Sequence, residues 1–123
     1  MGVDKGPVYC MTFVGLTFNE YFTKAMDTAF YPRQYEQIYP ALKLAGEAGE
    51  VAEKVGKCLR DKGGVIGEGD RKEIAKELGD VLWYVAAMCR DLDIEMAEVA
   101  SMNLAKLASR KSRGMLGGSG DNR

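Results

Sequence analysis

Apolar residues recur every three or four positions along most of this chain, which is the spacing of one face of an α-helix. The recurrence predicts helices from Thr17 to about residue 31 and over about residues 40–60, 71–92 and 95–111. Thr17 and Glu20 form the capping-box pattern of a helix start, and Asp70 and Asp93 are expected to cap the third and fourth helices. No segment alternates as a β-strand does, and the joints are short, which favours antiparallel neighbours. We therefore expect an all-α fold that resembles a four-helix bundle.

The length of the chain allows one domain with one core. Of its 123 residues 46% are apolar and 28% are charged, which is the balance of an ordinary globular protein. We expect residues 1–16 to form an irregular leader and residues 17–113 to form the helical domain. Residues 114–123 form a glycine-rich tail that is either disordered or closes over a bound ligand.

The charge and cysteine content narrow the function further. The net charge is −1 and no basic block occurs, so we do not expect a nucleic acid polymer as partner. No apolar run approaches the ~20 residues of a membrane span, so we expect no membrane partner. Cys10, Cys58 and Cys89 form no C-x-x-C pair, and we interpret Cys58 and Cys89 as buried apolar residues. An odd cysteine count without a signal peptide suggests a cytoplasmic protein.

Two pairs of acidic residues lie in the middle of the second and third predicted helices. Glu47 and Glu50 are three positions apart, as are Glu77 and Asp80, so each pair shares one helix face. If the glycine-rich segment 61–69 folds these helices into a hairpin, the pairs face each other. Four carboxylates in one place repel each other unless a cation lies between them, and oxygen ligands suit Mg²⁺, with Mn²⁺ as a substitute. The spacing therefore indicates a metal site of the kind that holds phosphates.

An ordinary solvated face is the alternative interpretation of these acids. Such a face usually carries Lys or Arg four residues after each acid, as Lys54 follows Glu50. Glu77 and Asp80 have no such partner, which favours the metal site. Gly46 and Gly49 each cost the second helix about 1 kcal/mol relative to alanine, which suggests the close approach of a ligand or another backbone.

Several other chemistries are excluded by the residues that are missing. The chain has no histidine, so it lacks the Glu-x-x-His motifs of di-iron bundles and cannot use histidine as a general base. It also lacks the G-x-x-x-x-G-K-[ST] segment of a P-loop. Among the remaining candidates for substrate contact, Lys57 could meet phosphates, and Trp83 could stack on a nucleobase or simply pack in the core.

The order and spacing of the motifs resemble a known family. LAGEAGEVAEKVGKCLRD (44–61), KELGDVLWYVAAMCRDLDI (76–94), NLAKLASRKSRG (103–114) and the terminal GGSGDNR look like the short, single-domain MazG-like all-α nucleoside triphosphate pyrophosphohydrolases of phages and bacteria. The resemblance covers about residues 17–123. It implies Mg²⁺-dependent cleavage between the α and β phosphates, which gives a nucleoside monophosphate and pyrophosphate.

The resemblance also implies roles for particular residues. Glu47, Glu50, Glu77 and Asp80 would be the metal ligands, and Asn103, Lys106 and Arg110 would contact substrate. These last three share one face of the fourth helix, and a plain solvated face remains the alternative for them.

The motif departs from many family members at one position. These members carry Glu-Glu-x-x-Glu, whose first Glu is proposed to activate the attacking water, whereas this chain has Gly46 there. The GExGE form is closer to the dCTP pyrophosphatase-like branch. Glu50 and Glu47 remain as the candidate catalytic residues.

Two other functions stay open on the sequence. One is a related enzyme such as a phosphoribosyl-ATP pyrophosphatase, and the other is a non-enzymatic helical interaction module with degenerate acids. Wide apolar helix faces in a chain of this size further suggest a homodimer or homotetramer.

Overall fold

The computed structural model describes residues 14–123, and this part of the chain contains helices and no strands. The predicted all-α class is therefore confirmed. The elements in chain order are α2 (Phe18–Met26), a short 3-10 helix η1 (Arg33–Tyr35), α3 (Ile38–Lys62), α4 (Glu68–Asp91) and α5 (Met96–Ser112). Residues 1–13, which make up most of the expected leader and include Cys10, lie outside the described part.

Helix α2 begins as predicted and ends earlier than predicted. Glu20 N donates to Thr17 Oγ1 (3.0 Å) and Thr17 N donates to Glu20 Oε2 (2.8 Å), which completes the capping box. The helix ends at Met26, and the carbonyl of Ala25 at this end accepts from Thr28 N (3.0 Å) and from two side chains. The Thr28 hydroxyl lies 2.6 Å from that oxygen and the Trp83 indole nitrogen 3.2 Å from it.

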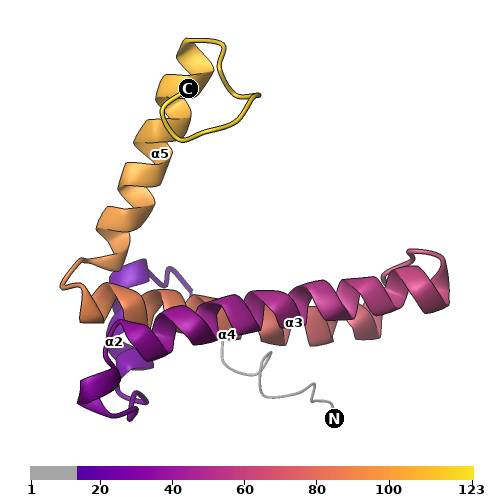
Figure 1. Ribbon diagram of the computed structural model, residues 1–123, viewed down its shortest axis with the longest axis horizontal. Coiled ribbons are helices and arrows are strands. Elements are labelled where there is room, and N and C mark those ends of the chain that lie inside the picture. The colour runs from indigo at the N-terminus through magenta and orange to yellow at the C-terminus, as the bar shows by residue number, and fades with distance from the viewer. Residues whose placement is uncertain (1–13) are drawn as a thin grey trace.

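Helices α3 and α4 form the antiparallel hairpin that the acidic pairs require (Figure 1). Gly63 ends α3 in the left-handed conformation, at φ +61°, where a side chain would be strained. The sequence predicted Asp70 as the N-terminal cap of α4, but the helix begins three residues earlier than this prediction. Gly67 is the capping position, and Asp70 reaches back from the first turn to accept a hydrogen bond from Gly67 N (3.0 Å).

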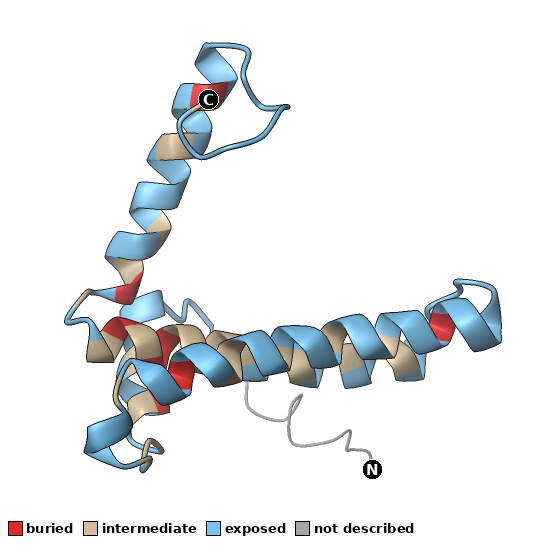
Figure 2. Ribbon diagram, viewed as in Figure 1, coloured by how far each residue is buried: buried red, intermediate tan, exposed pale blue. Residues whose placement is uncertain are grey.

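The buried core lies at one end of the hairpin, where α2, the end of α4 and the start of α5 meet (Figure 2). Ala86, Cys89 and Met96 form its centre, and aromatic and aliphatic side chains of α2 and α4 pack around them. Cys58 and Cys89 are buried and free, as predicted. Most of the remaining hairpin surface is exposed, so the core of a single chain is small.

Helix α5 leaves this core and points away from the hairpin (Figure 1). Asp93 was expected to cap it, but Asp93 adopts φ +56° in the joint and Glu95 takes the capping position. In this chain α5 therefore does not lie along α3 and α4. After the buried Met96, the larger apolar side chains of α5 are exposed, namely Val99, Met102, Leu104 and Leu107. Within residues 14–123, no helix is long and apolar enough to cross a bilayer.

Candidate active site

Three of the four predicted carboxylates meet in the middle of the hairpin. Glu47 on α3 and Glu77 and Asp80 on α4 each place one oxygen within 4.8 Å of the other two. The side chains of Glu47 and Glu77 are only 16% and 18% exposed, whereas Asp80 is an exposed residue. We call these three residues the acidic cluster. Each helix places its acidic residues on one face, and the antiparallel packing of the two helices brings these residues to the same height, as the sequence predicted.

The electrostatics of the acidic cluster fit a cation. Burial, followed by the charge of Asp80, raises the pKa of Glu47 above its ordinary value, and Lys43 only partly opposes this shift. Partial desolvation and the neighbouring Glu77 likewise raise the pKa of Asp80. Carboxylates that are desolvated and close together favour the protonated form unless positive charge compensates them. Their oxygen-only donor set suits a hard divalent ion.

Glu50, the fourth predicted ligand, lies outside the acidic cluster. It is an exposed residue one turn along α3, and its charge contributes to the raised pKa of Glu47. Glu50 is therefore near the acidic cluster, with its side chain in solvent. Its role as a ligand or as the catalytic base stays a prediction.

A lysine from the facing helix accompanies the acidic cluster. The sequence suggested that Lys54 pairs with Glu50 on the same helix, but Lys54 Nζ instead lies 3.4 Å from Glu77 Oε1 across the hairpin. Sequence spacing could not reveal this partner, because the pairing depends on the register of two helices. Lys43 gives the acidic cluster a second cation, with its Nζ 4.0 Å from Glu47 Oε1.

An aromatic pocket lies beside the acidic cluster. It has a volume of about 220 Å³ and is lined by Phe30, Tyr31, Pro32, Tyr39, Trp83 and Tyr84. Tyr84 connects the two features, because it lines the pocket and interacts with charges of the acidic cluster. Burial, the interaction with Tyr39 and the charges of Glu47 and Asp80 raise the pKa of Tyr84 to about 12. A ligand that reaches the carboxylates with its charged end can thus place a flat apolar group on aromatic rings.

Trp83, the predicted stacking residue, is a wall of this aromatic pocket. Its ring lies 4.9 Å from that of Tyr84 and 6.4 Å from that of Tyr31, both in edge-to-face arrangements. Its indole nitrogen donates to Thr28 Oγ1 (2.8 Å), which fixes the ring. Trp83 therefore packs against α2 and also lines a pocket, and its stacking on a nucleobase stays a prediction.

The predicted substrate contacts on α5 divide into two kinds. Asn103 and Lys106 line an open groove of about 550 Å³ with Asp121 and apolar side chains of α5. Arg110 is buried beneath the tail, where its Nη2 donates to the carbonyl oxygens of Gly120 (3.3 Å) and Asp121 (2.7 Å). Neither cation contacts the acidic cluster, because α5 points away from it (Figure 1).

The tail folds back on α5 rather than on the hairpin. Asp121 Oδ1 lies 3.0 Å from Lys106 Nζ and 3.3 Å from Arg110 Nη2, and these cations lower the pKa of Asp121. Arg113 holds the backbone oxygen of Arg123 (2.8 Å). The tail therefore packs on its own helix, and its closure over a bound ligand stays a prediction. Asp121 carries no sequence pattern that would reveal its contact with Lys106 and Arg110.

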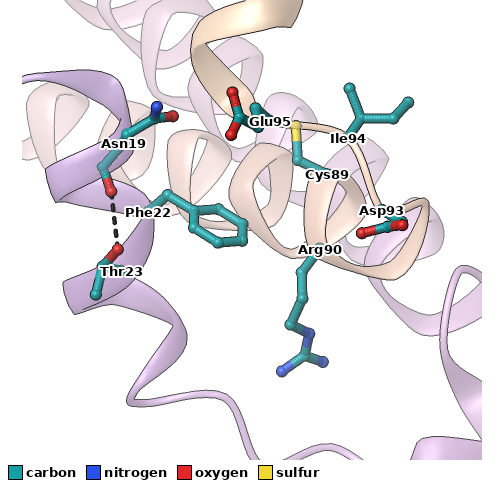
Figure 3. A pocket seen from close by; sticks show the side chains of 8 residues that line it. All are labelled: Asn19, Phe22, Thr23, Cys89, Arg90, Asp93, Ile94 and Glu95. Carbon is teal, nitrogen blue, oxygen red and sulfur yellow. Dashed lines mark hydrogen bonds between the residues drawn. The ribbon is translucent and has the colours of Figure 1, made fainter.

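Two further hollows lie away from the acidic cluster. Lys57 pairs with Glu53 (3.7 Å) and lines a hollow of about 280 Å³ near the hairpin tip, among several charges of both signs. A second hollow, of about 350 Å³, lies where α2 meets the joint between α4 and α5 (Figure 3). Its charged side chains, Arg90, Asp93 and Glu95, point in different directions, so they do not converge on one ligand (Figure 3).

Within residues 14–123, nothing lies close to the two unusual glycines of α3. A Cβ atom at Gly46 or Gly49 would meet no atom within 4 Å. The close approach that the sequence suggested is therefore not made by another backbone within the described part of the chain. A ligand or a second copy would account for it.

Comparison with known proteins finds a family and a relative that this chain resembles. The sequence model of the MazG nucleotide pyrophosphohydrolase domain matches residues 36–115, which span the acidic cluster and α5. The chain is 49% identical over 109 residues to the Gene 37 protein of Mycobacterium phage L5, an alignment that covers 84% of this chain and 96% of that protein. No solved structure matches the chain.

The fold, the acidic cluster and the domain match together define a hydrolase that acts on nucleotide phosphoanhydride bonds. The chain belongs to the MazG nucleotide pyrophosphohydrolase family. A nucleotide substrate follows from that membership, as does a general dependence on metal. The non-enzymatic interaction module considered from the sequence is thereby set aside.

Proposed function

We propose that this protein hydrolyses (d)NTPs between the α and β phosphates, to (d)NMP and pyrophosphate, with Mg²⁺ as its cofactor and Mn²⁺ as a substitute. The observation that carries the proposal is the acidic cluster of two facing helices beside an aromatic pocket. The chain thus offers oxygen ligands for a hard cation and a flat apolar surface for a base.

The acidic cluster would hold the metal. Glu47, Glu77 and Asp80 already converge, and Glu50 joins them or accepts the proton of the attacking water. A divalent cation at this place supplies charge neutralisation on the phosphate oxygens and polarisation of water. Lys54 and Lys43 balance the negative charge from the side of the protein.

The remaining substrate contacts would come from a second copy of the chain. In one chain α5 carries Asn103, Lys106 and Arg110 away from the acidic cluster, and its apolar face is left exposed by the rest of residues 14–123. A homodimer or homotetramer would cover that face and bring these groups, with Lys57 at the hairpin, to the phosphates. Light scattering of the purified protein measures the assembly.

Pyrophosphate release over all common NTPs and dNTPs, with and without Mg²⁺, tests the activity. Release that requires the metal and is lost in Asp80→Asn supports the proposal. Preference for phosphoribosyl-ATP over every nucleoside triphosphate would instead support the related pyrophosphatase. Turnover that is unchanged in Asp80→Asn and Glu77→Gln would remove the acidic cluster from the mechanism.

A further inference from the structure

A fully enclosed carboxylate lies at the end of α4, outside the acidic cluster. The side chain of Asp91 is 0% exposed. One of its oxygens, Oδ2, accepts hydrogen bonds from the Tyr31 hydroxyl (2.8 Å) and from Gln37 N (2.8 Å). The other, Oδ1, lies 3.1 Å from Arg90 Nε. A charge without solvent is tolerated only when it is bonded in this way, so each of these contacts is needed.

The partners of Asp91 come from the segment between α2 and α3. Gln37, the residue before α3, adopts φ +68°, a conformation that is unusual for a residue other than glycine. The Asp91 carboxylate satisfies the backbone N–H of Gln37 at this bend, and the Gln37 side chain returns a bond to the Asp91 carbonyl oxygen (3.1 Å). A strained conformation persists only when the surrounding structure fixes it, and Asp91 supplies that fixation.

The same contacts fix one wall of the aromatic pocket. The Tyr31 ring lies 5.3 Å from that of Tyr39 and 6.4 Å from that of Trp83. The Arg90 guanidinium lies 5.0 Å from the centre of the Tyr31 ring. The Arg90 side chain points away from the other side chains that line the hollow between α2 and the α4–α5 joint (Figure 3). Tyr31 is therefore held at its hydroxyl by Asp91 and over its ring by Arg90, both from the end of α4.

We propose that Asp91 is a positioning residue for the base of the substrate. It holds Tyr31 in place, so that the aromatic pocket keeps a shape that fits a flat heteroaromatic ring. This inference rests on the proposed function for the identity of the ligand. The side-chain contacts of Asp91 are to Tyr31, Gln37 and Arg90, and none of these belongs to the acidic cluster. Removal of Asp91 should thus affect the nucleoside half of the substrate and spare the phosphate half.

A purely structural role for Asp91 predicts something different. Buried ion pairs are weak indicators of stability, and breaking one by removing a partner usually destabilises the whole fold. A general loss of stability would affect binding of the phosphates and of the base alike. The separation of these two effects is what the experiment must measure.

Two substitutions test the proposal in the full-length protein. Tyr31→Phe removes one hydroxyl, and Asp91→Asn keeps the shape of the side chain but not its charge. Cys58→Ala, at a buried position at the other end of the hairpin, is the control for lost packing. The readouts are KM and kcat for the preferred nucleotide, and the inhibition constant of inorganic tripolyphosphate, which has no base.

We expect KM to rise about tenfold in Tyr31→Phe and Asp91→Asn, a loss at the low end of what stacking on aromatic rings contributes. Turnover and the tripolyphosphate inhibition constant should stay within twofold of the unsubstituted protein, and Cys58→Ala should change neither. An unchanged KM in folded Tyr31→Phe overturns the proposal, even if Asp91→Asn does not fold. An equal loss for tripolyphosphate and nucleotide also overturns it.

Trp83 gives a readout that does not depend on turnover. It is the only tryptophan in the chain and it lines the aromatic pocket, so its fluorescence reports occupancy. Free nucleosides should quench it, and more weakly in Tyr31→Phe. If this response holds while no nucleotide is hydrolysed, the proposed function fails and the role of Asp91 survives. If nucleotides are hydrolysed but nucleosides leave the fluorescence of Trp83 unchanged, the role of Asp91 fails alone.

Discussion

Lys54 Nζ lies 3.4 Å from Glu77 Oε1, so the cation that accompanies the second acidic pair comes from the facing helix. Lys54 thereby acts as an internal counter-ion to the acidic cluster. It lowers the repulsion between carboxylates when no metal is bound, and it opposes the positive charge of a metal that arrives. The pair therefore links the stability of the empty protein to its affinity for divalent ions.

Lys54→Met should tighten Mn²⁺ binding and destabilise the empty protein. A partly exposed charge contact is worth up to about 1 kcal/mol, which corresponds to roughly a threefold to fivefold change in the dissociation constant. Calorimetric titration with Mn²⁺ measures this change. Lys57→Met, which breaks an exposed pair on the same helix, is the control and should leave metal affinity unchanged. Weaker binding in Lys54→Met would show that Lys54 does not oppose the metal.

Asp80→Asn should stabilise the protein without metal and abolish its stabilisation by Mg²⁺ or Mn²⁺. The raised pKa of Asp80 means that its charge is unfavourable in the folded state, so a neutral isostere relieves repulsion. In the unsubstituted protein, metal at 100 times its dissociation constant adds about 2.7 kcal/mol to the free energy of unfolding. Thermal unfolding with and without metal measures both effects, and Glu53→Gln is the matched control. A normal metal shift in Asp80→Asn would exclude Asp80 as a ligand.

Mildly acidic pH should stabilise the metal-free protein relative to neutral pH. The folded-state pKa values of Glu47 and Asp80 are raised above their unfolded values. Folding therefore takes up protons. The stability that these two groups contribute is fully present at pH values below their pKa in the unfolded state, and it is lost as the pH rises through their pKa in the folded state. Metal competes with these protons, so the stabilisation by Mg²⁺ should grow over the same pH range. Thermal melts across pH, with and without metal, test both trends, which should vanish in a variant that carries Glu47→Gln and Asp80→Asn together.

Lys106→Ala should weaken nucleotide binding and leave metal binding unchanged. Lys106 lines the α5 groove with Asn103, far from the acidic cluster, and a charge-assisted contact to phosphate is worth about 1.5–3 kcal/mol. We expect KM to rise at least tenfold, whereas the Mn²⁺ dissociation constant stays the same. Lys111→Ala, an exposed lysine on the same helix, is the control. Steady-state kinetics that match the unsubstituted enzyme would return Lys106 to the solvated surface.

Deletion of residues 117–123 should lower activity. The tail covers Arg110 and places Asp121 against Lys106, so its loss leaves both predicted phosphate contacts without their present partners. Pyrophosphate release at saturating nucleotide measures the effect, and circular dichroism checks that the helices remain. Full activity of the shortened chain would make the tail dispensable.

Local sequence patterns predicted the helical segments and the acidic cluster, but not the contacts between distant segments. The 3.6-residue period and the spacing of Glu47, Glu77 and Asp80 determine one face of each helix, so the acidic cluster was predictable. The contact at the end of α2 was not, because Trp83, which donates to the carbonyl of Ala25 there, lies 58 positions further along the chain.

The same limit applies to charged partners. Lys54 follows Glu50 by four residues, which suggested a pair within α3, yet the register of the hairpin gives it to Glu77. Asp91 follows Arg90 in a helical segment and carries no pattern that would reveal its contact with Tyr31 and Gln37. Such contacts depend on the packing of the fold, and no local pattern encodes packing.

The divergence of α5 from the hairpin has a genetic consequence. If the acids and the α5 lysine act on one substrate molecule, they belong to different copies of the chain, because one copy holds them apart. A copy that lacks Asp80 and a copy that lacks Lys106 would each be inactive, and a mixed assembly would still contain one intact pair. Two defective alleles in the same cell would then complement each other.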